Sequence, residues 1–195
     1  MTNNTHTIHE QEAYDRTLFG FWIYIMTDCI LFATLFATYV VLQNGTFGGP
    51  TSKDLFNLPF ALTETVILLT SSFTSGLVML AAHRKDRSKV FVALALTFLL
   101  GAAFLAMELH EFNQFVQEGH SWRTSAFLSS FFTLVGTHGL HITAGLLWIL
   151  VMVGQLIVQG LQINTLRRLA CFTMFWHFLD VVWIFIFTIV YLLGV

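Results

Sequence analysis

Histidine and aspartate side chains inside long apolar segments are the residues of this sequence whose types and spacing could do chemistry. Trp176 to Asp180 reads Trp-His-Phe-Leu-Asp in the middle of an apolar run at 169–193. Asp180 follows His177 by three residues, so both lie on one helical face, which we expect to pack inward. A carboxylate at the centre of a membrane-length helix costs about 2.5–3.5 kcal/mol on insertion scales. We therefore expect Asp180 to have a partner within the protein.

Two further histidines, His138 and His141, lie three residues apart in the run Gly-Thr-His-Gly-Leu-His at 136–141. With His177 and Asp180 they have the ligand types of a His-rich metal site with a carboxylate. The sequence lacks, however, the paired Glu-x-x-His motifs of di-iron helix bundles. Of these two interpretations we favour hydrogen bonding between helices, in which a histidine of the fourth or fifth apolar run holds Asp180.

Small and hydrogen-bonding residues recur at four-residue intervals around these histidines, at Thr133, Thr137, His141 and Gly145. Such a stripe is typical of a membrane helix that approaches a neighbour closely. We expect its hydroxyl and imidazole groups to form hydrogen bonds across the contact.

Carboxyl groups in three other apolar runs are further candidates for structural, proton-related or lipid-related roles. Asp28 lies about nine residues into the first run, or roughly 14 Å deep at about 1.5 Å per residue. It suits a proton-path or lipid-facing role, or a buried hydrogen bond to a neighbouring helix. Glu64 lies near the outer end of the second run, and Glu108 and Glu111 share a face near the outer end of the third.

These three glutamates have a simpler interpretation, which we favour. They would be interfacial residues that reach water or pair with His110 or Arg123.

The elements that position these residues are membrane spans. The chain has 195 residues, of which 56% are hydrophobic and only 10% are charged, which is too apolar for a water-soluble domain of this size. After a polar tail at residues 1–18, disordered or lying on the membrane surface, five apolar runs are long enough to cross a bilayer. They lie at about 19–42, 58–82, 90–116, 126–158 and 169–193. We therefore predict an all-α, polytopic membrane helix bundle over residues 19–195.

Basic residues set the expected orientation and exclude one class of partner. Seven of the nine Lys and Arg residues fall in the N-terminal tail, the 83–89 turn and the 160–168 loop, which share one side of a five-span protein. The positive-inside rule makes this side cytoplasmic, so the N-terminus is expected in the cytoplasm and the C-terminus in the periplasm. The basic residues form no patch suited to nucleic acid.

No nucleophile elbow, phosphate-binding glycine loop or Cys-Cys pair occurs in the sequence. The residues alone therefore indicate a five-helix membrane protein with buried polar groups, without a catalytic centre of its own, within a larger assembly.

At two of its motifs the sequence resembles subunit III of the haem-copper oxidases. Residues 131–141 resemble the helix of that family with the motif Gly-x-His-Gly-Leu-His, and residues 176–183 resemble its Trp-His-Phe-x-Asp-x-Val-Trp helix. Residues 26–32 match the segment in which the family has a membrane-embedded Glu, and Asp28 stands there. Five helices, the short tail and the 44–50 loop are similar to the bacterial cytochrome bo-type ubiquinol oxidase branch.

The resemblance implies a non-catalytic subunit of a complex in the bacterial inner membrane that oxidises ubiquinol, reduces oxygen to water and pumps protons. It implies that haem b, haem o and copper belong to subunit I, and that subunits I, II and IV and membrane lipids are the partners. Assembly, phospholipid binding and sustained proton uptake are the implied roles. The alternative from another class is a proton-coupled transporter that uses Asp28, Asp180 and the histidines as a relay, although internal repeats and interrupted helices are not visible.

Overall fold

Five long α-helices make up the protein. The computed structural model describes residues 2–46, 48 and 57–194, with side chains from residue 15 onward, and no strand occurs in these ranges. The helices are α1 (Thr2–Leu42), α3 (Leu58–His83), α4 (Arg87–Gln117), α5 (Ala126–Gln159) and α6 (Ile163–Ile186), and α6 continues as the π-helix η1 (Phe187–Leu192). Each is long and apolar enough to span a membrane. The prediction of an all-α, five-helix membrane protein is confirmed.

Local sequence signals explain where the helices begin and end. Asp86 caps α4 by accepting a hydrogen bond from the backbone of Lys89, and Ser125 caps α5 by accepting one from Leu128. Such side chains satisfy N–H groups that have no partner in the first helical turn. At the other end of α5, Gly160 has a φ of 70°, a conformation that favours glycine.

Helix α1 and the start of α6 extend beyond the predicted apolar runs. Because α1 begins at Thr2, residues of the predicted polar tail are helical, while the cytoplasmic location of the tail stays a prediction. Helix α6 includes the basic pair at 167–168 that precedes the fifth apolar run in the sequence. Gly49 and Pro50, part of the predicted break after the first run, lie outside the described residues.

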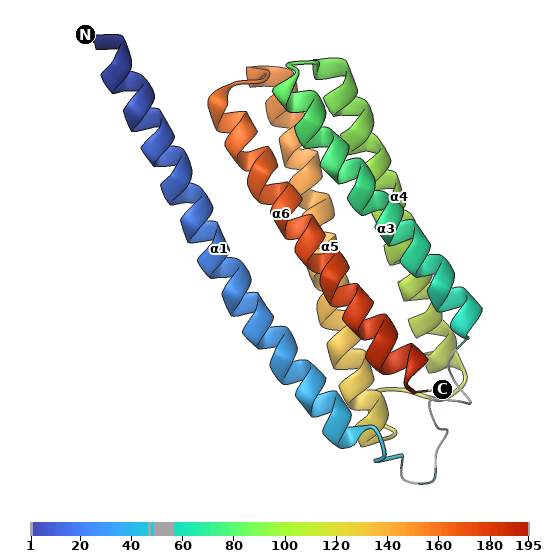
Figure 1. Ribbon diagram of the computed structural model, residues 1–195. Helices are drawn as coiled ribbons and strands as arrows, with labels where there is room; N and C mark the ends of the chain where they lie inside the picture. Colours follow the sequence, from blue (N-terminus) through green and yellow to red (C-terminus); the bar gives the residue numbers. More distant parts are fainter. Residues whose placement is uncertain (1, 47, 49–56, 195) are drawn as a thin grey trace.

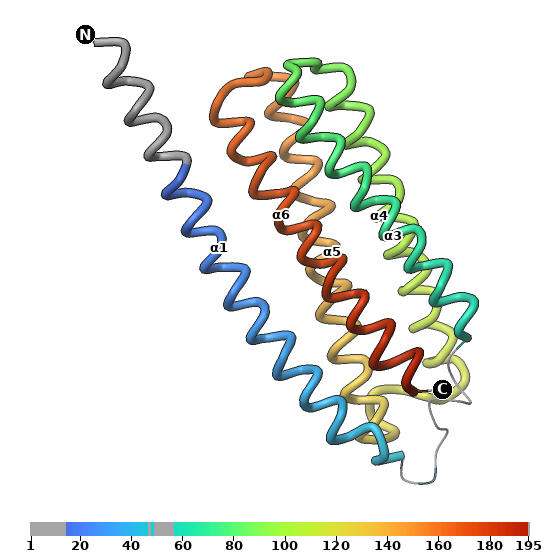
Figure 2. The backbone as a smooth tube through the Cα atoms, in the orientation of Figure 1, coloured from blue at the N-terminus to red at the C-terminus, as the bar shows by residue number. Residues whose placement is uncertain are grey.

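Helices α3, α4, α5 and α6 form a bundle, and α1 lies beside it (Figure 1). Within the bundle α3 packs against α4 and α6, and α5 packs against α4 and α6, whereas α1 contacts α5 and α6. The tube in Figure 2 shows that consecutive helices run in opposite directions. The 83–89 turn and the 160–162 connection thus lie at one end of the bundle.

The outer surface of the bundle is apolar. Phe19, Leu140 and Val158 are exposed over 68%, 71% and 83% of their surface. Exposed apolar side chains on all sides are expected where lipid replaces water as the solvent. The acidic side chains within the spans are buried in contrast, and they are Asp28, Glu64, Glu108, Glu111 and Asp180.

Candidate functional site

Trp176 is the centre of the bundle. Its ring is 1% exposed, and its Nε1–H donates a hydrogen bond to Ser71 Oγ of α3 at 3.1 Å. A Cβ on Gly101 of α4 would lie 2.8 Å from the indole ring, and one on Gly145 of α5 would lie 2.6 Å from it. Real Cβ atoms do not approach other atoms so closely. Gly101 and Gly145 therefore leave the space that the Trp176 ring fills, and we call this space the tryptophan socket. It allows α3, α4 and α5 to pack around Trp176 of α6.

His177 and Asp180 face α3 rather than α5. His177 Nδ1 lies 3.4 Å from Ser72 Oγ, and the Ser72 side chain also lies near the Asp180 carboxyl group. The prediction that a histidine holds Asp180 is wrong, because Trp176 occupies the inward side of α6 and turns Asp180 towards Ser72. The inward placement holds for Asp180, which is 8% exposed, whereas His177 lies on the exposed side of α6.

His138 is packed among aromatic rings. It is fully buried, stacks on Trp183 at a centroid distance of 5.4 Å and meets the edge of Phe104 at 5.9 Å. Neither ring nitrogen has a hydrogen-bond partner among the described residues. Trp183 in turn donates a hydrogen bond to Thr65 of α3 at 3.0 Å. His138 thus links α5 to α6 through ring packing.

Three buried glutamates lie at the contact of α3 and α4, with Tyr191 of η1 beside them. We call these four residues, Glu64, Glu108, Glu111 and Tyr191, the carboxyl cluster. Glu64, Glu108 and Glu111 are 0%, 2% and 6% exposed. Tyr191, fully buried in η1, donates a hydrogen bond of 2.8 Å to Glu111 Oε2. The interfacial interpretation of these glutamates is wrong, because η1 and α5 cover the end of the α3–α4 pair and exclude water from them.

The cluster is closely packed and lacks a counter-ion. A Cβ on Gly139 would lie 2.7 Å from Glu108 Oε1, so α5 and α4 touch at this carboxyl group. None of the three glutamates forms an ion pair with Lys, Arg or His in the described ranges, His110 and Arg123 included. Unpaired charge is costly to bury. Tyr191 donates to Glu111, whereas both carboxyl oxygens of Glu64 and one of Glu108 have no hydrogen-bond partner among the described residues.

Asp28 and His141 join α1 to α5. Asp28 Oδ2 lies 3.8 Å from His141 Nε2, and the Tyr24 side chain, one turn earlier on α1, also lies near this carboxyl group. His141 Nδ1 lies 2.7 Å from the Thr137 carbonyl, which only accepts, so Nδ1 carries a proton. The Asp28 carboxyl group faces the other ring nitrogen, Nε2. Asp28 is buried, with 10% of its side chain exposed, whereas 19% of the His141 side chain is exposed.

The hydroxyl groups of the predicted stripe on α5 do not bond to a neighbouring helix. Thr133 and Thr137 each donate to a carbonyl of α5 itself. Hydroxyl contacts between helices occur instead at the α3–α4 pair, where Thr74 Oγ1 and Thr97 Oγ1 lie 2.9 Å apart. The close approach expected at Gly145 is present, through the ring of Trp176.

Metal-ligating side chains are not clustered in the part of the chain that the structure describes. No three His, Cys, Asp or Glu side chains there lie close enough to hold one metal ion. His138 is enclosed by rings, and His141 and His177 each have another partner. This arrangement can hold helices together.

Sequence reasoning missed the partners of the predicted residues. Ser71 and Thr65 on α3 accept the hydrogen bonds of Trp176 and Trp183. Ser72 lies 3.4 Å from His177, and Tyr191 donates to Glu111. The signal that could have identified the serines is the polar run Thr70-Ser71-Ser72 within an otherwise apolar span. Tyr191 had no such signal, because its position follows from η1.

Comparison with known proteins identifies relatives over almost the whole chain. The family model described as cytochrome c oxidase subunit III matches residues 1–195. A cytochrome bo(3) ubiquinol oxidase subunit 3 of Pseudomonas aeruginosa is 55% identical over 186 residues, which cover 95% of this chain and 89% of that protein. A cytochrome c oxidase subunit 3 of Bacillus sp. strain PS3 is 46% identical over 90% of this chain and 84% of its own length. A quinol oxidase subunit 3 of Bacillus subtilis is 43% identical over 98% and 94%.

Proposed function

Because this chain belongs to the cytochrome c oxidase subunit III family, we propose that it is the non-catalytic subunit III of a proton-pumping, cytochrome bo-type ubiquinol oxidase. The observation that carries this proposal is the 55% identity, over 95% of the chain, to a protein named as that subunit. The names of the relatives do not support the alternative of a proton-coupled transporter.

The polar groups of the chain support an accessory role. Trp176, Asp180 and the carboxyl cluster are engaged with neighbouring helices of the same chain, and no described group of side chains fits a metal. In this proposal haem b, haem o and copper lie in subunit I, which carries out ubiquinol oxidation and oxygen reduction. The present chain contributes a stable helical partner, which supports assembly.

We further propose that the chain is embedded in the bacterial inner membrane beside subunits I, II and IV. The N-terminus and the basic turn at 83–89 then face the cytoplasm, in accordance with the distribution of Lys and Arg. Asp28, His141 and His177, at or near the surface between α1 and α6, are the proposed residues for proton-related or lipid-related roles. Glu64, Glu108, His138, Trp176 and Asp180 have structural roles in this proposal.

Purification of the tagged chain from its native membrane in a mild detergent tests the proposal. We expect the chain to co-migrate with haem absorbance and with ubiquinol oxidase activity that needs added ubiquinol and oxygen. A colourless, homogeneous protein without activity would contradict it. Proton-coupled uptake of a solute by that colourless protein in vesicles would revive the transporter alternative.

A further inference from the structure

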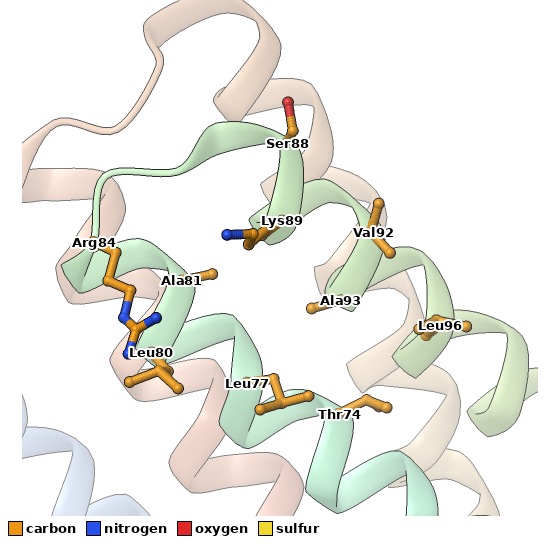
Figure 3. Close-up of a pocket in the computed structure, with 10 residues that line it drawn as sticks. All are labelled: Thr74, Leu77, Leu80, Ala81, Arg84, Ser88, Lys89, Val92, Ala93 and Leu96. Atoms are coloured by element: carbon orange, nitrogen blue, oxygen red, sulfur yellow. The ribbon is translucent and has the colours of Figure 1, made fainter.

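An apolar groove with a basic end runs between α3 and α4 (Figure 3). It encloses a volume of about 350 Å³ and lies on the outer surface of the hairpin formed by these helices. Its apolar part includes Leu77, Ala81 and Ala93, and its basic end carries Arg84 and Lys89. From Thr74 to Arg84 it extends roughly 15 Å along α3 at about 1.5 Å per residue.

The apolar part of the groove offers hydrocarbon to an occupant. Ala81 and Ala93 are small, face the same space from opposite helices and are each 7% exposed, so they leave a furrow between larger side chains. The hydroxyl of Thr74 is already bonded to the Ser71 carbonyl and to Thr97. A straight alkyl chain suits such a furrow, whereas a polar ligand would find no free partner there.

The basic end offers two cations to an anionic group. Figure 3 shows the Arg84 and Lys89 side chains on the two helices that border the same end of the groove. Lys89 Nζ also lies 3.0 Å from Asp86 Oδ2, but 70% of the lysine side chain is exposed and can contact a second anion. Hydrogen bonds from Lys89 keep the pKa of Asp86 below its usual value, so Asp86 remains ionised at neutral pH.

The other basic residues of the 83–89 turn are engaged elsewhere or lie outside the groove. His83 Nδ1 is engaged with the Met79 carbonyl of its own helix, and Arg87 packs its guanidinium group against Gly160. Lys85 is exposed but does not line the groove. Arg84 and Lys89 are thus the basic residues of the turn that are placed for a ligand in the groove.

We propose that this groove binds one anionic phospholipid, with an acyl chain along the apolar part and the phosphate between Arg84 and Lys89. Basic pockets between membrane helices on the cytoplasmic side are suited to anionic head groups. This inference rests on the proposed function, which places the 83–89 turn at the cytoplasmic leaflet of a bacterial membrane. It assigns the lipid to a surface that does not involve α1.

Charge variants test the phosphate part of the site in the intact complex. The complex is delipidated in detergent and titrated with phosphatidylglycerol or phosphatidylcholine, and bound lipid is counted by native mass spectrometry. We expect the double variant Arg84→Gln, Lys89→Gln to weaken binding of one phosphatidylglycerol on the order of tenfold. The matched double variant Lys85→Gln, Arg168→Gln removes the same charge from the same end of the bundle outside the groove, and should bind as the wild type does.

Apolar variants test the acyl-chain part. Ala93→Leu fills the groove without a change in charge and should weaken binding, whereas Ala95→Leu, on the exposed side of α4 outside the groove, should not. Equal binding of phosphatidylglycerol and phosphatidylcholine by the wild type would overturn the proposal. So would equal binding by the groove variants and their controls. Haem absorbance in the same samples reports separately on the proposed oxidase membership.

Discussion

The interior of the α3–α6 bundle and its contact with α1 both contain acidic side chains, yet the two regions satisfy them differently. In the interior, Glu64, Glu108 and Glu111 are sealed by four elements, and Tyr191 donates to Glu111. At the contact with α1, the buried Asp28 faces His141, whose side chain is 19% exposed. Helix α1 is also less covered than α3 and α6, because 22% of its most apolar 18 residues are buried, against 44% in each of the other two helices.

This difference indicates a division of roles within one small membrane protein. A sealed carboxyl group cannot exchange protons readily and holds helices in register, so its loss should reduce stability. The Asp28–His141 pair lies at the less covered helix and has one partly exposed partner, so its loss should affect function under turnover more than assembly. Substitutions in the two regions can therefore separate stability from function.

The largest effect is expected in the interior, from Gly145→Val. A Cβ at this position would lie 2.6 Å from the Trp176 ring, and overpacking of a dense core costs about 1–3 kcal/mol or more. We expect a several-fold loss of assembled complex, measured as haem per milligram of membrane protein. Gly154→Val, on the same helix with open space around it, is the control and should assemble normally. Equal yields from the two variants would mean that the socket is not needed.

Next in size is the effect of Tyr191→Phe on the carboxyl cluster. Removal of the hydroxyl leaves Glu111 Oε2 buried without its donor, a change that costs about 1–3 kcal/mol. The melting temperature of the complex should fall measurably. In the double variant Tyr191→Phe, Glu111→Met, the Glu111→Met change should lower the melting temperature by less than it does alone. The reason is that it removes the carboxyl group that Tyr191→Phe leaves without a donor. Simple additivity would show that the two side chains are not coupled.

The spans could be predicted from the sequence, but the helix rotations could not. The length of an apolar run is enough to distinguish a membrane-spanning helix from a shorter buried helix. The five spans could therefore be predicted. Spacing of three residues correctly placed Asp180 inward, but it also placed His177 inward, although His177 is exposed. Which side of α6 faces the centre depends on the room that Gly101 and Gly145 leave for Trp176, and this is a property of three helices together.

The candidate residues were therefore easier to predict than their partners. Rare ionisable residues in apolar segments stand out, and Asp28, Glu108, His138 and Asp180 all proved to be buried. The polar contacts of α6 and of Glu111 are instead made with serine, threonine and tyrosine. These residue types are common in membrane helices and give no distinctive pattern. The interfacial interpretation of the glutamates was wrong because depth along one helix does not reveal which other helices cover its end.

A smaller effect is expected at Asp180, on the α6–α3 contact. Asp180→Asn keeps a hydrogen-bonding group for the Ser72 hydroxyl, whereas Asp180→Leu removes it, so Asn should retain more assembled complex than Leu. The difference should be about 1 kcal/mol, measured by thermal unfolding in detergent. If Ser72 is the partner, Ser72→Ala should narrow the gap between the two variants. An unchanged gap would assign the effect of Asp180 to another contact.

The smallest effect on stability, and the sharpest contrast with the interior, is expected for Asp28→Asn. The pair with His141 has one partly exposed partner and its atoms are 3.8 Å apart, so its loss should cost less than about 1 kcal/mol and leave the haem content unchanged. The variant loses the ionisable group that faces His141, and we expect activity to decay several-fold sooner during continuous turnover. Thr27→Val, whose hydroxyl bonds only to α1, is the matched control and should decay as the wild type does.

A second variant tests whether Asp28 and His141 act as a pair. His141→Gln should then shorten turnover similarly, and the double variant should be no worse than either single one. If Asp28→Asn instead lowers haem content while turnover lasts normally, the contact with α1 is structural in the same sense as the carboxyl cluster, and the contrast between the two regions disappears.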